Sequence, residues 1–307
     1  MRSDSDFISD GTRCAAWHYA SGDGDRRPCV VMGHAFGYTR DSGLEPYAEQ
    51  LAAAGYDALL LDFRHLGASD GEPRQLVSVK HQLDDYRAAV AHARGLPGVD
   101  PEQIVLWGMS MAGGHVLTIA AEDPRIAAVI SVFGAVDMVA ATLMSLRSAG
   151  PVPMTRLSAA AVRDVAGALR GKPPVYVPIA GPPGSVAFVT APGAAEAMQA
   201  AAGPTWRNEV CARAALELGM QRPGRHAKDL PCPTLFQVAD FDQTVSSPAI
   251  VKAASAATGR ARVRRYPCDH LDAVGDQRAA IAAHQVEFLD SAVGGVRQTT
   301  SHVAAQS

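Results

Sequence analysis

The run Gly108-Met109-Ser110-Met111-Ala112-Gly113 decides the predicted fold, because a β-type segment turns there directly into a helical one. Residues 104–107 are a short apolar run typical of a buried strand, and residues 111–121 are rich in small side chains and indicate a buried helix. A serine at such a turn stands at the carboxyl end of a sheet, in a strained backbone that requires small neighbours. Ala112 departs from the usual G-x-S-x-G pattern, and we expect its methyl group to be tolerated. Ser110 is therefore the candidate nucleophile.

The segments around this turn alternate between β-rich runs and helical patterns. Such alternation is typical of a mostly parallel sheet with helices on both faces. In one of the helical patterns, apolar side chains recur every three or four positions, which predicts one buried face. We expect strands at residues 12–20, 29–32, 58–61, 104–107, 126–133, 234–239 and 262–266, and helices at residues 44–54, 75–94, 111–121, 247–257 and 276–289.

The pattern changes between residues 137 and 229. This stretch holds ten of the twenty prolines and five of the nine methionines. We interpret it as a lid insertion that divides a core made of residues 1–136 and 230–292. Residues 293–307 are small and polar, without periodicity, and we predict a flexible tail.

Two later loops supply the groups that a serine nucleophile requires. Asp242 follows the β-type run at residues 234–239, and His270 follows the run at residues 262–266. The order serine, acid, histidine is that of enzymes with this kind of turn. A neutral histidine can remove the serine proton, and a carboxylate fixes the imidazole tautomer. Asp240 remains open as the rival acid, whereas the other histidines considered have less suitable positions in the chain: His65, His81, His115, His226 and His284.

Acyl transfer also requires backbone N–H groups that bind a developing oxyanion. The loop His34-Ala35-Phe36-Gly37 follows an expected strand, and Met111 follows the candidate nucleophile. We nominate the N–H groups of Phe36 and Met111, and we expect the Phe36 ring to wall the pocket. A simple turn between strand and helix is the alternative for this loop.

Two further features receive no catalytic role. The polar loop at residues 62–71 contains Asp62 and Arg64, for which we expect a structural ion pair. Cys268 lies two residues before His270, and we favour packing over a catalytic thiol for it.

Composition and charge argue against several other classes of protein. The net charge of −3 comes from 28 basic and 31 acidic residues without a long run of either sign, so nothing favours nucleic acid or an anionic membrane as a partner. No apolar run approaches the length of a membrane span, and the first residues lack a secretory pattern. Five widely spaced cysteines indicate a reduced, cytoplasmic protein. The sequence predicts neither a nucleotide loop nor a metal site, and it leaves a homodimer open.

Through residues 34–37, residues 108–113, Asp242 and His270, the chain resembles the α/β-hydrolase superfamily over most of its length. The loop at residues 62–71, followed by Glu-Pro, is similar to the branch with serine aminopeptidase-like, dienelactone hydrolase-like and polyketide transferase-like members. The resemblance implies an α/β-hydrolase fold with a mostly parallel eight-stranded sheet, a lid after the sixth strand, and no cofactor. The family usually has His-Gly where this chain has His-Ala in the first of these loops.

The function expected from these residues is a serine hydrolase that cleaves a small-molecule ester or thioester through an acyl-enzyme on Ser110. The methionines of the lid suggest an apolar acyl pocket, and packing within the lid explains them equally well. Three alternatives remain: an acyltransferase or polyketide-releasing enzyme with the same triad, an amide or C–C bond hydrolase, and a non-catalytic ligand-binding protein with this fold.

Overall fold

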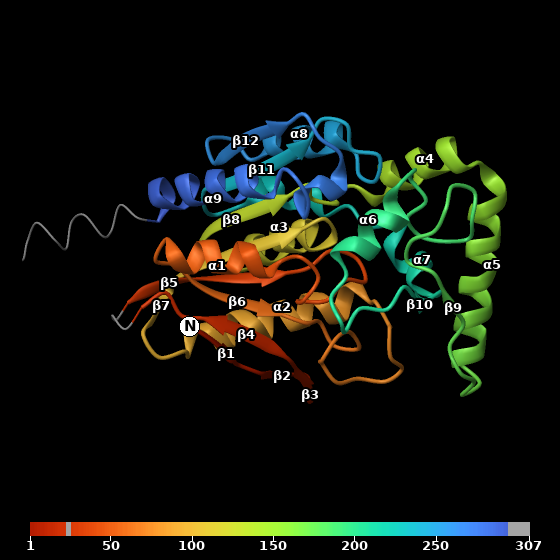
Figure 1. Cartoon of the computed structure of the whole chain (residues 1–307), viewed down its shortest axis with the longest axis horizontal. Helices are drawn as coiled ribbons and strands as arrows, with labels where there is room; N and C mark the ends of the chain where they lie inside the picture. Colours follow the sequence, from red (N-terminus) through yellow and green to blue (C-terminus); the bar gives the residue numbers. More distant parts are fainter. Residues whose placement is uncertain (23–25, 294–307) are drawn as a thin grey trace, which may run out of the picture.

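A computed structural model describes residues 1–22 and 26–293, so the predicted flexible tail lies almost entirely outside the described residues. Its centre is a sheet of eight strands in the spatial order β1-β4-β6-β5-β7-β8-β11-β12 (Figure 1). The pairs β1 with β4 and β4 with β6 are antiparallel, and all other neighbours are parallel, which confirms the predicted sheet. The strands are β1 (Arg2–Asp4), β4 (Ala16–Tyr19), β5 (Arg27–Gly33), β6 (Asp57–Leu61), β7 (Val99–Met109), β8 (Ile126–Val132), β11 (Thr234–Ala239) and β12 (Ala261–Tyr266).

Helices cover both faces of this sheet, so its central strands are mostly apolar and are buried over most of their length. In β7, Val105 and Trp107 pack into one core, and Ile104 and Leu106 pack into the other, because successive side chains of a strand point to opposite faces. Helices α1 (Glu45–Ala53) and α9 (Arg278–Ala292) close the first core, and helices α2 (Val79–Arg94), α3 (Met111–Glu122) and α8 (Ser247–Ala256) close the second.

The ends of the predicted core elements lie within three residues of the observed ones, except that β7 begins five residues earlier than expected and α2 four residues later, and except at residues 12–20. One strand was expected there, and this expectation is wrong: β3 (Thr12–Cys14) pairs with β2 (Phe7–Ser9) in a separate hairpin, whereas β4 joins the main sheet. Between β3 and β4, the N–H of Ala15 donates to Ser69 Oγ at 2.8 Å, and its carbonyl accepts from the N–H of Asp62 at 2.8 Å. The chain changes sheets at Ala15 because the N–H and the carbonyl of this residue form hydrogen bonds with the loop after β6 and not with a strand.

The expected ion pair between Asp62 and Arg64 does not form. Asp62 instead accepts the backbone N–H groups of Arg40 at 2.7 Å and Ala68 at 3.0 Å. Arg64 Nε donates to Asp85 of α2 at 2.7 Å. The two side chains point in different directions after β6. The carboxylate of Asp62 binds the backbone of its own and a neighbouring loop, whereas the guanidinium of Arg64 contacts α2.

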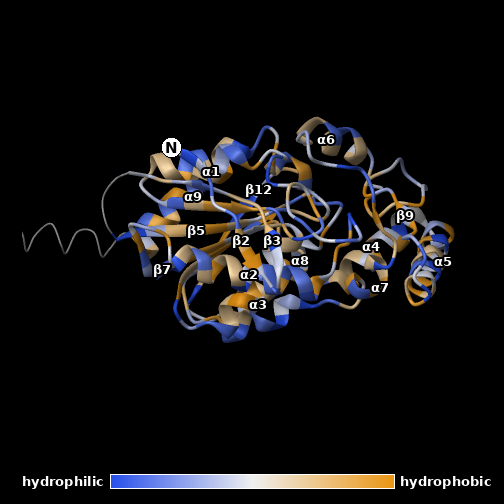
Figure 2. Ribbon diagram, turned by 90° about the horizontal axis from the view of Figure 1, so that it is seen from below, coloured by the Kyte–Doolittle hydropathy of each residue, from blue (hydrophilic) through white to orange (hydrophobic). Residues whose placement is uncertain are grey.

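Between β8 and β11 the chain builds a mainly helical layer beside the carboxyl ends of the strands, with α5 at its outer limit (Figures 1 and 2). This layer follows the sixth strand of the sheet in chain order. None of the helices within residues 1–22 and 26–293 has the length and apolar character needed to cross a membrane. The layer comprises α4 (Met138–Ala149), α5 (Pro151–Ala168), β9 (Tyr176–Val177), α6 (Ala194–Ala201), β10 (Val210–Cys211), α7 (Ala214–Leu218) and the 3₁₀ helix η1 (Pro223–Asp229), which packs against α3 and α8.

A buried chain of hydrogen bonds connects three strands to α9. Trp107 Nε1 donates to Gln285 Oε1 at 2.9 Å, and Gln285 Nε2 donates to Gln237 Oε1 at 2.8 Å. Gln237 Nε2 then donates to the Tyr266 hydroxyl at 2.7 Å and to the Ile281 carbonyl at 3.0 Å. Because these side chains belong to β7, β11, β12 and α9, the network fixes the strands relative to one helix.

Replacing Gln285 with leucine tests this network. Gln285→Leu leaves the Trp107 indole N–H and the Gln237 carbonyl without their partner, so we expect the free energy of unfolding to fall by roughly 1–3 kcal/mol for each group. Urea denaturation followed by circular dichroism measures the loss. The control Gln199→Leu, on an exposed position of α6, is expected to change stability by less than about 0.5 kcal/mol. Equal losses in the two variants would show that the network contributes nothing specific.

Candidate active site

Ser110 lies in the turn between β7 and α3 with a positive φ of 53°. Two backbone hydrogen bonds hold this conformation. The N–H of Ser110 donates to the Val132 carbonyl at 2.9 Å, and the Ser110 carbonyl accepts from the N–H of Ala135 at 2.8 Å. Since a positive φ is strained for a residue with a side chain, β8 and the loop after it hold the serine in place.

Glycines allow α3 to pass close to the sheet at this turn. A Cβ on Gly108 would lie 2.2 Å from the Ala112 carbonyl oxygen, and a Cβ on Gly113 would lie 2.7 Å from Gly134 Cα. Either side chain would push α3 away from the strands. Ala112, which stands where the usual pattern has glycine, is fully buried at this contact.

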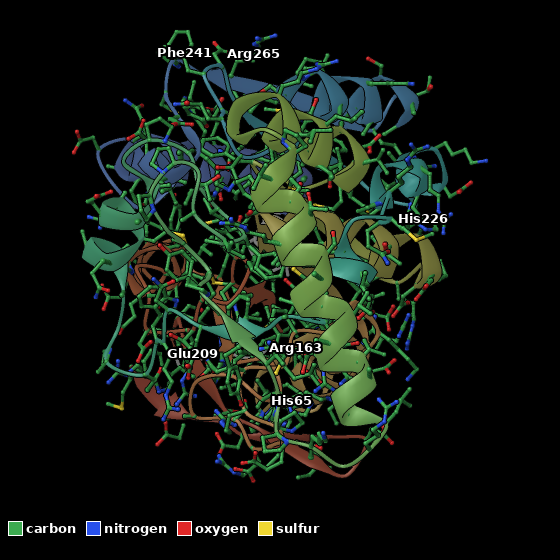
Figure 3. The ribbon with its side chains drawn as sticks, turned by 90° about the vertical axis from the view of Figure 1, so that its right-hand side faces the viewer. His65, Arg163, Glu209, His226, Phe241 and Arg265 are labelled. Carbon is green, nitrogen blue, oxygen red and sulfur yellow. The ribbon has the colours of Figure 1, made fainter. Side chains whose placement is uncertain are left out.

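The structure brings Ser110, His270 and Asp242 together. His270 Nε2 lies 2.9 Å from Ser110 Oγ, and His270 Nδ1 lies 2.7 Å from Asp242 Oδ2. The three residues follow β7, β12 and β11, whose carboxyl ends meet at one edge of the sheet. Asp240 does not contact His270 but pairs with Arg265 at 2.7 Å, and Figure 3 shows Arg265 near the outer edge of the molecule.

The carboxylate of Asp242 is fully buried and held on both sides. Its Oδ1 accepts the backbone N–H groups of Thr244 at 2.8 Å and Val245 at 2.7 Å, and its Oδ2 faces His270. Because the two backbone bonds fix the carboxylate, the imidazole is held in the orientation that points Nε2 at the serine.

Asp269 and Gln243 join the loop of Asp242 to the loop of His270, although the sequence patterns had indicated no role for either residue. Asp269 accepts the backbone N–H groups of His270 at 2.7 Å and Gln243 at 3.0 Å, and the Gln243 side chain donates to it at 3.1 Å. Their positions beside His270 and Asp242 in the chain were the only available signal. The contact itself depends on how two loops meet.

Burial disfavours the charged imidazole of His270, but the charge and hydrogen bond of Asp242 outweigh it, so the pKa of His270 lies above its ordinary value. The neutral imidazole is the form that can accept a proton from Ser110, and this form increases as the pH rises through that pKa. Burial raises the pKa of the Cys268 thiol to about 12, which agrees with packing as its role.

Ser110 and His270 line a cavity of about 260 Å³. Phe36 and Met111 also line it, and the Phe36 ring packs on Phe188 with a centroid separation of 4.7 Å. Met111 is the first residue of α3, so its N–H has no partner within the helix and is available to a ligand. Among the described residues, no Asp, Glu, Lys or Arg lines this cavity.

The remaining candidate histidines have their partners away from Ser110. The partners are Gln82 for His115, Tyr266 for His284, Arg225 for His226, and a stacked pair formed by His65 and His81.

The described part of the chain contains no group of three or more His, Cys, Asp or Glu side chains that could hold a metal ion.

The chain is similar to several known proteins. A family model described as serine aminopeptidase, S33, matches residues 24–268. The quorum-quenching protein AidA of Acinetobacter baumannii (strain MDR-ZJ06) is 36% identical over 93% of each chain. The polyketide transferase ATR5 of Stachybotrys chlorohalonatus (strain IBT 40285) is 35% identical over 60% of this chain and 58% of its own. The crystal structure of the alpha/beta hydrolase GrgF from Penicillium sp. sh18 has a TM-score of 0.81 at 25% identity and covers 96% of this chain and 99% of that chain.

The variant Asp242→Asn separates the two effects on His270. It removes the Asp242 charge and ionic hydrogen bond, which raise the pKa of His270, and leaves the burial, which lowers it, so we expect that pKa to fall. The rate of Ser110 labelling by a fluorophosphonate is measured between about pH 5 and 9. In the variant, the pH below which this rate falls should be lower than in the wild type. Its plateau is expected to drop by up to ~10⁴-fold, because the imidazole is no longer held in the required tautomer.

The matched control for this experiment is Asp240→Asn, which removes a carboxylate two residues away. Since Asp240 pairs with Arg265 and not with His270, we expect the labelling rate of this variant to depend on pH in the same way as that of the wild type. An unchanged profile in Asp242→Asn, or the same shift in both variants, would contradict the role given to Asp242.

Proposed function

The chain belongs to the serine aminopeptidase family, S33, of the α/β hydrolases, and on that premise we propose that it is a serine hydrolase acting on an ester or thioester of a small molecule. One observation carries this proposal. Ser110, His270 and Asp242 form a continuous hydrogen-bonded chain that opens into an apolar cavity. Such a chain activates a hydroxyl group, which is otherwise a weak nucleophile.

In the proposed acylation step, Ser110 Oγ attacks the carbonyl carbon of the substrate and His270 Nε2 takes the serine proton. The negative charge moves to the carbonyl oxygen, where the N–H groups of Phe36 and Met111 bind it; one such donor contributes about 10²–10³ in rate. Asp242 stabilises the imidazolium. The tetrahedral intermediate then collapses, and the alcohol or thiol leaves with the proton that His270 returns.

Deacylation repeats these steps with water. His270 takes a proton from a water molecule, the resulting hydroxide attacks the acyl-enzyme carbonyl, and Ser110 leaves with a proton from His270. The products are the free acid and the regenerated serine, so the cycle requires no cofactor.

The cavity walls favour an uncharged acyl group of modest size. The volume of about 260 Å³ lies just below the range of roughly 300–1,000 Å³ that is usual for small-molecule sites. Met138, Met154 and Met198 contribute flexible thioether side chains to the walls. These residues belong to the segment 137–229, which we propose is a lid over a core of residues 1–136 and 230–292.

A reducing, cytoplasmic location is part of the same proposal. All five cysteines are unpaired and buried, which supports a compartment in which disulfides do not form. The proposed partner is a small acyl substrate.

The serine hydrolase proposal is tested first with a fluorophosphonate probe. We expect one label on the folded protein, mapped by mass spectrometry to Ser110, and hydrolysis of short- and medium-chain p-nitrophenyl esters. Ser110→Ala should lose the label and reduce turnover by up to ~10⁶-fold, because the nucleophile is gone. Ser158→Ala, which changes another serine of the same cavity wall, is the control and should keep both. A folded wild-type protein without label would overturn the proposal and favour a non-catalytic binding protein.

A second candidate function is transfer of the acyl group to an alcohol or amine in place of water. The relationship to a polyketide transferase and the apolar cavity favour it, because an apolar site holds little water to compete with an organic acceptor.

Product analysis distinguishes hydrolysis from transfer. The wild type is given a p-nitrophenyl ester together with increasing concentrations of a primary alcohol or amine. A hydrolase is expected to release mainly the free acid at every acceptor concentration, since water attacks the acyl-enzyme. If the acylated alcohol or amine becomes the main product while p-nitrophenol release continues, the protein is an acyltransferase instead. Ser110→Ala with the same mixture corrects for uncatalysed transfer.

A further inference from the structure

The outward side of α4 and α5, with the turn that follows α5, combines cations and aliphatic side chains that are all exposed. We call this surface the α4–α5 outer face. In Figure 3 α5, which carries the labelled Arg163, crosses the side of the molecule that faces the viewer. The face consists of Leu143, Leu146, Arg147, Val152, Arg156, Val162, Arg163, Val165, Leu169, Arg170 and Lys172.

The charge of this face is positive, in contrast to the chain as a whole. Residues 138–175 contain five basic residues and one acidic residue, a net charge of +4, whereas the whole chain carries −3. The one acidic residue, Asp164, is buried and pairs with Arg213 at 2.7 Å, so it does not neutralise the outer face. Within the described residues, none of the five cations forms an ion pair with an acidic side chain.

The two kinds of side chain form separate stripes along α5. Arg156 and Arg163 are seven residues apart on α5, which places them on one side of the helix, and Arg170 follows seven residues later in the turn after the helix ends at Ala168. Val162 and Leu169 are also seven residues apart, and 58% and 84% of their surfaces are exposed. A basic stripe beside an aliphatic stripe is typical of helices that lie in the interface of an anionic membrane.

We propose that the α4–α5 outer face docks onto a lipid surface that carries anionic headgroups. The headgroups match the arginine stripe, and the acyl region below them matches the aliphatic stripe. A second copy of this chain fits less well, because a two-fold contact would place the same cations against each other. Nucleic acid would satisfy the cations and leave the aliphatic stripe without a partner.

The inner sides of the same two helices face the catalytic cavity. Thr142 and Ser145 of α4 and Met154 and Leu157 of α5 line it. Docking therefore leaves only the layer of α4 and α5 between the cavity and the lipid. If the proposed function holds, the substrate class is an acyl compound that partitions into membranes. The docking itself does not depend on catalysis.

Vesicle flotation with the Ser110→Ala protein tests docking without turnover. We expect the protein to float with vesicles of phosphatidylcholine and phosphatidylglycerol and not with phosphatidylcholine alone. High salt should weaken the attraction, since it shortens the screening length to about 3 Å at 1 M. The triple variant Arg156→Gln, Arg163→Gln, Arg170→Gln should bind about a hundredfold more weakly. The double variant Val162→Ser, Leu169→Ser should also bind more weakly, with its salt dependence retained.

The control triple variant Lys252→Gln, Arg262→Gln, Arg264→Gln removes three exposed cations from α8 and β12 and should float like the parent. Circular dichroism verifies that each variant is folded. Equal binding to both kinds of vesicle, no binding to either, or equal effects of the two triple variants would overturn the proposal. Light scattering that shows a dimer lost only in the α5 triple variant would assign the face to a second copy of the chain.

The failure of docking and the failure of the proposed function are distinguishable. Fluorophosphonate labelling of Ser110 in vesicle-free buffer measures the catalytic site alone, and we expect the wild type and the α5 triple variant to label at equal rates. Labelling without flotation would reject the lipid surface and retain the hydrolase, whereas flotation without labelling would reject the hydrolase and retain the surface.

Discussion

The strained backbone of Ser110 is the constraint on which the rest of the structure depends. A residue with positive φ between a strand and a helix persists only if its surroundings hold it, and here β8 and the following loop supply both hydrogen bonds. The close approach of α3 leaves no room for a side chain at Gly108 or Gly113. The turn therefore determines where the hydroxyl points, which helix N–H lies beside it, and at which sheet edge any partner must stand.

The partners reach that edge because parallel strands end there. β11 and β12 place their following loops next to the turn, and the network through Trp107, Gln285 and Gln237 keeps these strands at fixed spacing. Within the loops, backbone N–H groups fix the carboxylate of Asp242, so one of its oxygens remains for His270. The polar groups of the site are thus ordered before a substrate arrives, which is the condition for strong electrostatic stabilisation.

The segment between β8 and β11 gives the site its chemical character. Its helices present apolar side chains to the cavity and cations to the outside, so one layer separates two environments. Asp164 holds this layer together: its carboxylate accepts three hydrogen bonds from Arg213 and one from the N–H of Val175. A buried carboxylate with this many donors stays charged and connects α5 to the segment around Arg213, whereas the cations Arg156 and Arg163 of α5 are exposed.

The sequence by itself determined the features that local patterns encode. Strand and helix periodicity, small residues around Ser110 and the order serine, acid, histidine were sufficient for the fold and for the residues to test. Only the tertiary structure decided which carboxylate lies against His270, that Asp62 contacts Arg40 in place of Arg64, and that the chain changes sheets at Ala15. The physical reason is that neighbouring loop residues have similar local preferences, so the direction of each side chain depends on partners that are distant in the sequence.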